Sequence, residues 1–260
     1  MDSIICSTLK EKMISRYENL KSKGLVEKPT FSCAKCEDKG YTFNKNDEVI
    51  WCECKLKKDE EQRLLKSGLV DRVKTNTFKS YKQEHKIQAL AIQRKKAVDT
   101  CLKFLKDFKA SNPSLILMGE VGAGKTHLAI ATANKLLSKY NVKYVLYDEI
   151  KELRFYLTKR EILDEKIRMF KETPILFIDD FFKNLHKVND YEKIKSEIEV
   201  VYEIINYRYN QKKPLIITTE LNINQLMKVD KAIASRILEM ARDYRISFDG
   251  IELNYRIFGE

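Results

Sequence analysis

The stretch LILMGEVGAGKTHLAI, residues 115–130, decides how the middle of this chain folds. Its first residues are apolar and typical of a short buried strand, and its last residues have the apolar spacing of a helix. The turn between them fits the phosphate-binding pattern G-x-x-x-x-G-K-[ST]. In that pattern backbone N–H groups surround phosphate oxygens at a helix N-terminus, where the helix dipole favours an anion. The stretch therefore predicts a binding site for a nucleoside triphosphate.

Two residues of this loop have specific expected roles. We expect Lys125 to reach the β- and γ-phosphates and Thr126 to be a ligand of Mg²⁺. The alternative is a glycine-rich turn without a ligand, in which the Lys-Thr pair would stand at this spacing by chance. His127 follows inside the helix, where it either packs or lines the phosphate site. The predicted nucleotide-binding residues are Gly119, Glu120, Val121, Gly122, Ala123, Gly124, Lys125, Thr126 and His127.

A second apolar stretch, PILFIDDFF, ends in two acidic residues about fifty positions farther along the chain. An acid at the end of a buried parallel strand lies at the mouth of the sheet, beside the phosphate loop. We expect Asp179 to hold the water shell of the magnesium ion. We expect Asp180 to polarise the attacking water. The alternative is an ordinary strand end followed by an Asx turn.

Two further stretches predict polar groups at the same site. The strand PLIITTE ends in Thr218, Thr219 and Glu220, which we expect to face the γ-phosphate, with Thr219 as the residue that senses hydrolysis. Simple capping of the strand end is the alternative. In ASRILEMAR, Arg236 is the candidate for an arginine that reaches the γ-phosphate of a neighbouring subunit. A solvated helix arginine is the alternative there.

The chain is strongly basic, with a formal net charge of +11 over 260 residues. Residues 1–65 carry only about +1 of this charge, so the basic excess belongs to the predicted nucleotide-binding part. A basic surface indicates a polyanionic partner, nucleic acid first and an anionic membrane surface second, although a generally lysine-rich composition would give the same count. The N-terminus lacks an apolar signal-peptide core, and no apolar run approaches the ~20 residues that span a bilayer. We expect a soluble, cytoplasmic protein without a membrane partner.

Four of the six cysteines form a metal-binding pattern, in which Cys33-x2-Cys36 and Cys52-x-Cys54 are separated by 15 residues. The spacing is close to the C-x2-C…C-x2-C zinc pattern, with the second pair one residue shorter. Four thiolates predict a closed tetrahedral Zn²⁺ site of the structural type. The metal would supply folding energy to a module that has little core of its own. Unrelated free thiols and a redox CxxC pair are the alternatives.

Strands and helices alternate after this module and predict an α/β fold, with a parallel sheet that has helices on both faces. The expected strands are SLILM, KYVLYD, PILFIDD and PLIITTE, followed by two short strands around Asp249-Gly250 in the tail. A hairpin that turns near residues 44–47 is expected between the cysteine pairs. Cys6 and Cys101 fall in helical patterns and predict packed thiols. Helices are expected over residues 3–22, 56–66, 85–109, 124–139, 149–170 (continuous or broken), 189–210, 222–228 and 231–242.

The order of these parts resembles the core of the AAA+ ATPases. More narrowly, it resembles the DnaC/DnaI-type bacterial helicase loaders and their phage relatives. The resemblance covers roughly residues 60–260 and rests on RLLKSGLVDRVKTNTF, LMGEVGAGKTHLA, LFIDDFF, IITTELN and ASRILEMA. It implies an AAA+ P-loop core without a separate lid domain, with ATP and Mg²⁺ as cofactors. It also implies that adenine lies near Thr77 and Phe78, and that Arg236 acts as the finger on a neighbouring subunit.

The resemblance also implies a division of labour along the chain. Residues 1–60 would be a zinc-binding domain that contacts the helicase, as in loaders of the DnaI kind. Residues 61–260 would be the AAA+ ATPase domain, in which residues 61–110 form a helical linker. The segment 149–170 would make oligomer and single-stranded DNA contacts. The implied function is ATP-dependent loading of a hexameric replicative helicase onto single-stranded DNA by an ATP-dependent homo-oligomer.

The chain departs from the family pattern at two positions. Asp180 stands where AAA+ proteins usually have glutamate, and its shorter side chain predicts slow hydrolysis. Glu220 stands where the family often has asparagine, which is why the sensing role is assigned to Thr219. Two other functions remain open. One is an IstB-like transposition ATPase, which normally lacks a zinc adaptor, and the other is an ATP-binding interaction protein that does not hydrolyse ATP.

Overall fold

The computed structural model describes residues 31–185 and 191–258, and the helix expected over residues 3–22 lies outside them, as do Cys6 and His186. The chain divides into two compact units, Met1–Lys58 and Asp59–Glu260. Helix α2 (Glu53–Ser67) includes the boundary between them. None of the described helices is long and apolar enough to cross a membrane.

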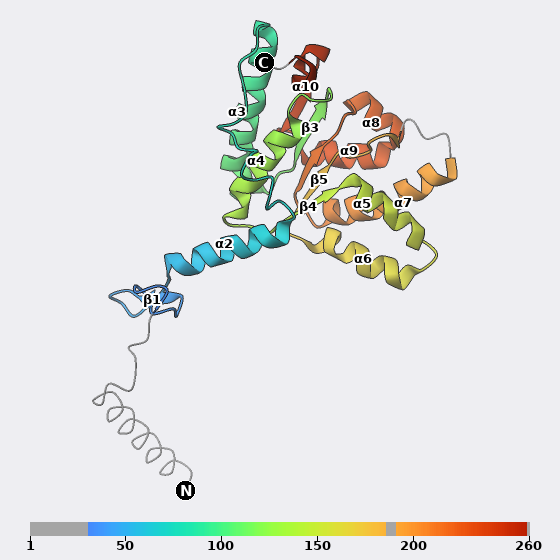
Figure 1. Cartoon of the computed structure of the whole chain (residues 1–260). Helices are drawn as coiled ribbons and strands as arrows, with labels where there is room; N and C mark the ends of the chain where they lie inside the picture. The colour runs from blue at the N-terminus through green and yellow to red at the C-terminus, as the bar shows by residue number, and fades with distance from the viewer. Residues whose placement is uncertain (1–30, 186–190, 259–260) are drawn as a thin grey trace, which may run out of the picture. The chain divides into compact units, whose positions relative to one another are not determined.

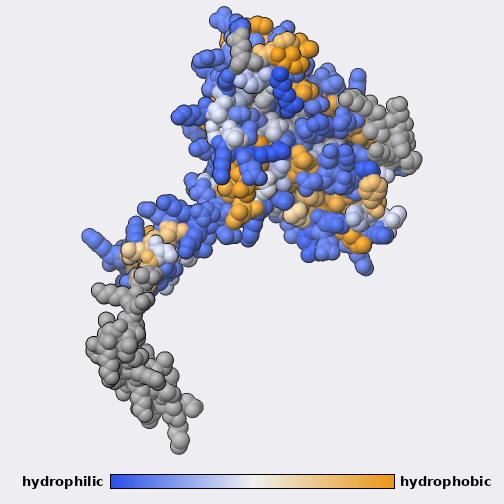
Figure 2. All heavy atoms as spheres, in the orientation of Figure 1, coloured by the Kyte–Doolittle hydropathy of each residue, from blue (hydrophilic) through white to orange (hydrophobic). Residues whose placement is uncertain are grey.

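The first unit contains the predicted hairpin. Strands β1 (Tyr41–Phe43) and β2 (Val49–Trp51) pair antiparallel. The connection turns at residues 44–47, where the side-chain oxygen of Asn44 accepts hydrogen bonds from the backbone N–H groups of Asn46 and Glu48. Such an Asx-type turn is a common use of asparagine between strands. Apolar side chains lie on the surface of this unit in Figure 2, and Phe43 and Trp51 are 60% and 59% exposed. The hairpin therefore buries little apolar surface of its own.

The second unit is built on a five-stranded sheet with the order β4-β5-β6-β3-β7. Every neighbouring pair of strands is parallel. The strands are β3 (Leu115–Gly119), β4 (Val142–Leu146), β5 (Ile175–Asp179), β6 (Leu215–Thr218) and β7 (Arg245–Phe248). The predicted parallel α/β sheet of the AAA+ P-loop type is confirmed.

Helices cover both faces of this sheet, as Figure 1 shows. One face packs against α3 (Gln88–Ser111) and α4 (Lys125–Leu137). The other packs against α5 (Tyr147–Lys151), η1 (Glu152–Tyr156), α6 (Arg160–Glu172), α7 (Tyr191–Asn210), α8 (Ile223–Val229) and α9 (Lys231–Met240). Successive residues of β3 alternate between the two faces, with Leu115 on the α4 side and Ile116 on the other. Because both faces of the sheet are buried at its centre, β3 and the first four residues of β5 are apolar rather than alternating. The edge strand β7 alternates instead, with exposed Arg245 and Ser247 between buried Ile246 and Phe248.

The tail differs from the sequence prediction of two strands around Asp249-Gly250. Only β7 forms within the described tail, and it is followed by η3 (Ile251–Leu253) and α10 (Tyr255–Phe258). Gly250 has a φ of 123° and redirects the chain. Leu253 is then fully buried, and the backbone N–H of Tyr255 donates to the carbonyl of Gly122 at 3.1 Å. These contacts place the tail on the phosphate loop, so no hairpin returns to the sheet.

Candidate nucleotide-binding site

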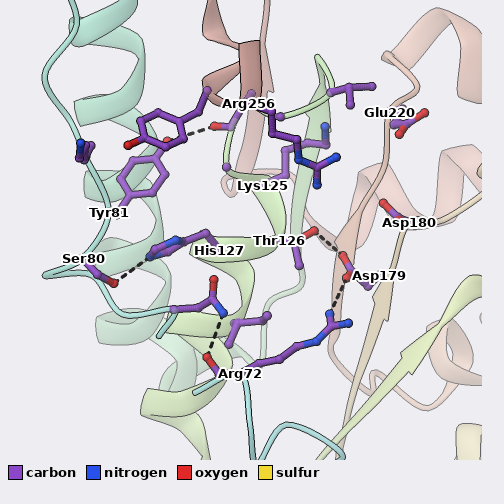
Figure 3. Close-up of a pocket in the computed structure, with 18 of the residues that line it drawn as sticks. Arg72, Ser80, Tyr81, Lys125, Thr126, His127, Asp179, Asp180, Glu220 and Arg256 are labelled. Carbon is purple, nitrogen blue, oxygen red and sulfur yellow. Dashed lines mark hydrogen bonds and ion pairs between the residues drawn. The ribbon is translucent and has the colours of Figure 1, made fainter. Parts of the chain in front are cut away.

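A cavity of about 540 Å³ lies in the second unit, where β3, β4, β5 and β6 end. This is the edge of an open parallel sheet at which ligands bind. The volume falls within the roughly 300–1,000 Å³ of ordinary ligand pockets. Of the residues predicted at the site, those that line the cavity are Val121, Gly122, Ala123, Gly124, Lys125, Thr126, His127, Asp179, Asp180 and Glu220 (Figure 3).

Two glycines of the loop allow a close approach that other residues would prevent. Gly119 and Gly122 have φ values of 103° and 73°. A Cβ atom on Gly119 would lie 2.2 Å from the carbonyl oxygen of Phe248, and one on Gly122 would lie 2.1 Å from Oδ1 of Asn254. The loop is therefore pressed against the end of β7 and the residues that follow it. Helix α4 begins directly after the loop, with Gly124 as its N-cap.

A Gly119→Ala variant is expected to lose about 3 kcal/mol of unfolding free energy, because the new methyl group meets backbone and the φ value is unfavourable. Gly68→Ala is the matched control. Its φ is also positive, at 82°, but the nearest atom to the added Cβ lies at 3.5 Å. That variant is expected to lose only about 1 kcal/mol. Urea unfolding measures both, and equal losses would contradict the steric argument.

Lys125 is 6% exposed, and its ammonium group donates to the carbonyl oxygens of Gly119 at 2.7 Å and Glu120 at 2.6 Å. Gly119 and Glu120 do not line the cavity themselves, and they contact it through this side chain. Burial lowers the pKa of Lys125, while the nearby carboxylates of Glu220 and Asp180 oppose that change. Since an ammonium group has three donors, it keeps one for a phosphate oxygen even in this arrangement.

Asp179 is 3% exposed, and both of its oxygens accept hydrogen bonds. Oδ1 accepts from the hydroxyls of Thr126, at 2.8 Å, and Thr218. Oδ2 accepts from the Tyr144 hydroxyl at 3.0 Å and from the Arg72 guanidinium at 3.5 Å. Burial, then the Asp179 carboxylate, raises the pKa of Tyr144, so this hydroxyl remains a donor. The phosphate loop and the acidic strand end therefore meet, and their hydroxyl and carboxylate oxygens are of the type that binds Mg²⁺.

Asp180 lines the cavity in the left-handed conformation, with a φ of 57°. Its backbone N–H donates to the hydroxyl of Thr218 at 3.0 Å. Its carboxylate accepts a hydrogen bond from Lys183 at 2.6 Å, and this bond raises the pKa of Lys183. The carboxylate predicted to polarise water is thus held by a cation.

The structure does not bring Thr219 into the cavity, which corrects the expectation that it faces the γ-phosphate. Its side chain is fully buried, where it donates to the carbonyl of Phe181 at 2.7 Å and accepts from the N–H of Leu221 at 3.1 Å. Successive residues along a strand point to opposite sides. Thr218 therefore bonds to Asp179, and Thr219 points away. Glu220 is the residue of this strand end that lines the cavity.

Arg236 is not among the residues that line the cavity of its own chain. Its guanidinium donates to Oδ1 of Asn206 at 3.0 Å and to the carbonyl of Ala232 at 2.9 Å. It also lies 5.2 Å from the ring centre of Tyr202 and 5.5 Å from that of Tyr209. A role of Arg236 at a neighbouring subunit's nucleotide stays a prediction.

The linker before α3, residues 68–87, forms a wall of the cavity, close to where the resemblance places adenine. Nε2 of His127 lies 2.8 Å from the carbonyl oxygen of Thr77 and 3.2 Å from the Ser80 hydroxyl, and the Tyr81 ring stands edge-on at 5.4 Å. The side chains that line this wall include Ser80 and Tyr81 rather than Thr77 and Phe78. The lining residues missed in the sequence are Arg72, Asn76, Ser80, Tyr81, Lys82, Arg94, Ile130, Leu146, Lys183, Tyr255 and Arg256.

The first unit brings together the predicted zinc ligands Cys33, Cys36, Cys52 and Cys54. Their sulfur atoms all lie within 4.8 Å of one another. The Cys33–Cys52 and Cys36–Cys54 pairs are 3.8 Å and 3.4 Å apart. Zn–S bonds of about 2.3 Å in a tetrahedron require sulfurs about 3.8 Å apart, so the group fits the ion. The backbone N–H of Gly40 donates to the sulfur of Cys36 at 3.3 Å, which would orient that ligand.

Residues 94–252 match the protein family described as Novel STAND NTPase 3. The chain is 30% identical over 253 residues to the phage-like element PBSX protein XkdC of Bacillus subtilis (strain 168), covering 90% of this chain and 92% of that protein. It is 29% identical over 129 residues to the replicative helicase loader DnaI of the same bacterium, covering 47% of this chain and only 39% of DnaI. The predicted resemblance to DnaC/DnaI-type loaders is confirmed.

The crystal structure of the DnaC helicase loader has the same fold as the second unit. The TM-score is 0.55 at 21% identity, and the match covers 68% of this chain and 99% of that one. At this identity the likeness concerns the fold alone.

Proposed function

The chain belongs to the Novel STAND NTPase 3 family, and we propose that it is an ATPase that loads the replicative DNA helicase onto single-stranded DNA. The observation that carries the proposal is the Thr126–Asp179 hydrogen bond of 2.8 Å, which joins the phosphate loop to the acidic strand end inside a cavity of nucleotide size. The similarity to the helicase loader DnaI supports the helicase as the partner.

The residues of the cavity divide the work of binding a triphosphate. Backbone N–H groups of the loop and the Lys125 ammonium bind phosphate oxygens at the N-terminus of α4. Thr126 and Asp179 would hold Mg²⁺, which neutralises charge on the phosphates when it is bound. Asp180 would orient and polarise the attacking water. Because Lys183 holds that carboxylate at 2.6 Å, we expect hydrolysis to be slow until this pair opens.

The remaining features support particular partners for each unit. Residues 1–65 are near neutral, and the first unit has exposed aromatic side chains, so this part of the chain suits contact with the helicase better than contact with DNA. The basic excess of the second unit suits the phosphate backbone of single-stranded DNA. A homo-oligomer assembled by ATP in the cytoplasm would guide that strand into the hexamer.

Three measurements test the proposal. ATP turnover, with and without single-stranded DNA, separates an ATPase from a non-hydrolysing interaction protein, which the Asp180–Lys183 pair would favour. Co-purification with a hexameric replicative helicase separates a loader from an IstB-like transposition ATPase, for which a zinc adaptor would be unusual. Mass measurement with and without ATP reports assembly. A chain that binds ATP but neither assembles nor retains the helicase would contradict loading.

An Arg236→Ala variant is expected to keep its affinity for ATP within about twofold, because this side chain is absent from its own cavity. If Arg236 acts on a neighbouring subunit, turnover should fall by about 10³-fold, or ATP-dependent assembly should become undetectable. Arg242→Ala, two residues beyond the end of α9, is the control and should retain both. Normal turnover and assembly by the Arg236 variant would remove the proposed role.

A further inference from the structure

Arg72 belongs to the linker but reaches the most buried carboxylate of the nucleotide site. Its guanidinium lies 3.5 Å from Oδ2 of Asp179 (Figure 3). It also donates to the Tyr144 hydroxyl and lies 5.0 Å from the centre of the Tyr144 ring. The Arg72 side chain is 44% exposed, whereas that of Asp179 is 4% exposed. Arg72 is therefore the cation in direct contact with Asp179, whereas Lys125 acts on this carboxylate from a longer distance.

The backbone of Arg72 is held in place by the linker around it. Leu69 is fully buried and Val73 is 7% exposed, so the chain is anchored on both sides of Arg72. The N–H groups of Arg72 and Val73 both donate to the carbonyl of Leu69. The side-chain amide of Asn76 donates to the carbonyl of Arg72 at 2.9 Å. Because this turn is held by packing and hydrogen bonds, the guanidinium can shift by side-chain rotation without movement of the linker.

We propose that Arg72 is a positioning residue that balances the charge of Asp179 in the metal-free site and is displaced from it by the magnesium ion. The inference rests on the proposed binding of a magnesium triphosphate in this cavity. Thr126, Thr218 and Tyr144 donate neutral hydroxyl groups to the carboxylate, so Arg72 is the cationic donor among its four hydrogen-bond partners. It is also the most distant of them and the one most open to solvent, and it is therefore the partner most easily exchanged.

Charge balance predicts how the protein responds to the metal. Without Mg²⁺, Arg72 reduces the repulsion between Asp179 and the phosphates, so ATP alone retains some affinity. With Mg²⁺, the ion must compete with the guanidinium for the same carboxylate. Removing Arg72 should therefore weaken the binding of metal-free ATP and strengthen the contribution of Mg²⁺. The test uses one ratio, the dissociation constant for ATP in EDTA divided by the dissociation constant for ATP in Mg²⁺. Both changes raise this ratio.

The test is this ratio in purified full-length chains, measured by calorimetry with ATP. Arg72→Ala is expected to raise it about fivefold, a size set by one partly exposed charge near another. Arg72→Lys keeps the charge, and its ratio should lie between those of Arg72→Ala and the wild type. In an Asp179→Asn background, Arg72→Ala should change the ratio by less than about twofold, because the group through which it acts is gone.

Lys74→Ala is the matched control. It removes one positive charge from the same linker at an exposed position outside the cavity. The inference is overturned if Arg72→Ala leaves the ratio within about twofold of the wild type, or if Lys74→Ala raises it equally. A wild-type chain that binds no ATP in either condition would instead overturn the proposed function.

Discussion

Replacing Lys125 by alanine is expected to weaken ATP binding by about 100-fold or more, to the point where calorimetry detects no heat of binding. A charged donor aimed at phosphate from a largely buried position contributes about 3 kcal/mol. No other described lysine of α4 can substitute, since Lys135 is exposed in the last turn of the helix and outside the cavity. Lys125 itself is 6% exposed, so few water molecules compete with phosphate for its ammonium group.

The control for this prediction is Lys135→Ala, which removes the same charge from the same helix and should leave ATP affinity unchanged. Lys125 also donates to the carbonyls of Gly119 and Glu120, and its loss could loosen the loop. Thermal unfolding without nucleotide measures that contribution separately. If Lys125→Ala unfolds at the wild-type temperature and still binds ATP tightly, the loop does not hold the triphosphate.

The parts of this site that the sequence predicted depend on short-range patterns. The loop from Gly119 to Thr126 has fixed spacing because the backbone itself surrounds the phosphate. Asp179 was predictable because an acid at the end of an apolar strand must lie at the sheet edge. Thr219 was expected to face the γ-phosphate but lies outside the cavity, because the pattern gives the strand end and not the side to which each side chain points. The direction of each side chain depends on the register of β6 against β3 and β5.

The resemblance placed adenine near the linker, but short-range patterns could not predict which linker side chains line the cavity or how the tail folds. Arg72 meets Asp179 across 107 positions of sequence, and Tyr144 meets it across 35, without a motif that joins them. The tail has the alternating pattern of strands, yet Leu253 is buried and Tyr255 bonds to Gly122. Tertiary packing determines both structures. The tail packs on the phosphate loop, because the loop offers it a backbone carbonyl and a glycine that leaves room for it.

A Cys52→Ser variant is expected to purify without zinc and with a disordered first module, while the second unit binds ATP within about twofold of the wild type. Structural zinc supplies about 10–16 kcal/mol of folding free energy in small modules of this kind. The two strands of the hairpin have only three residues each, and Phe43 and Trp51 are largely exposed, so little apolar burial remains to replace the metal.

Three measurements check this variant. Metal analysis should give one zinc per wild-type chain and less than about 0.1 per Cys52→Ser chain, since three thiolates hold the ion far more weakly than four. Limited proteolysis should cut the variant within residues 31–58 and spare the rest. Calorimetry should show retained ATP binding. Cys101→Ala is the control, because Cys101 is fully buried in the core of the second unit and should not affect zinc content.

The same variant separates the two proposed activities of the chain. If the zinc module is the helicase-contacting part, Cys52→Ser should lose co-purification with the hexameric helicase and keep ATP binding. Lys125→Ala should lose ATP binding and keep a zinc-loaded module. Zinc retained at wild-type stoichiometry in Cys52→Ser would show that the four sulfurs lie together without forming a metal site. If the zinc-free chain still retains the helicase, another part of the protein contacts the helicase.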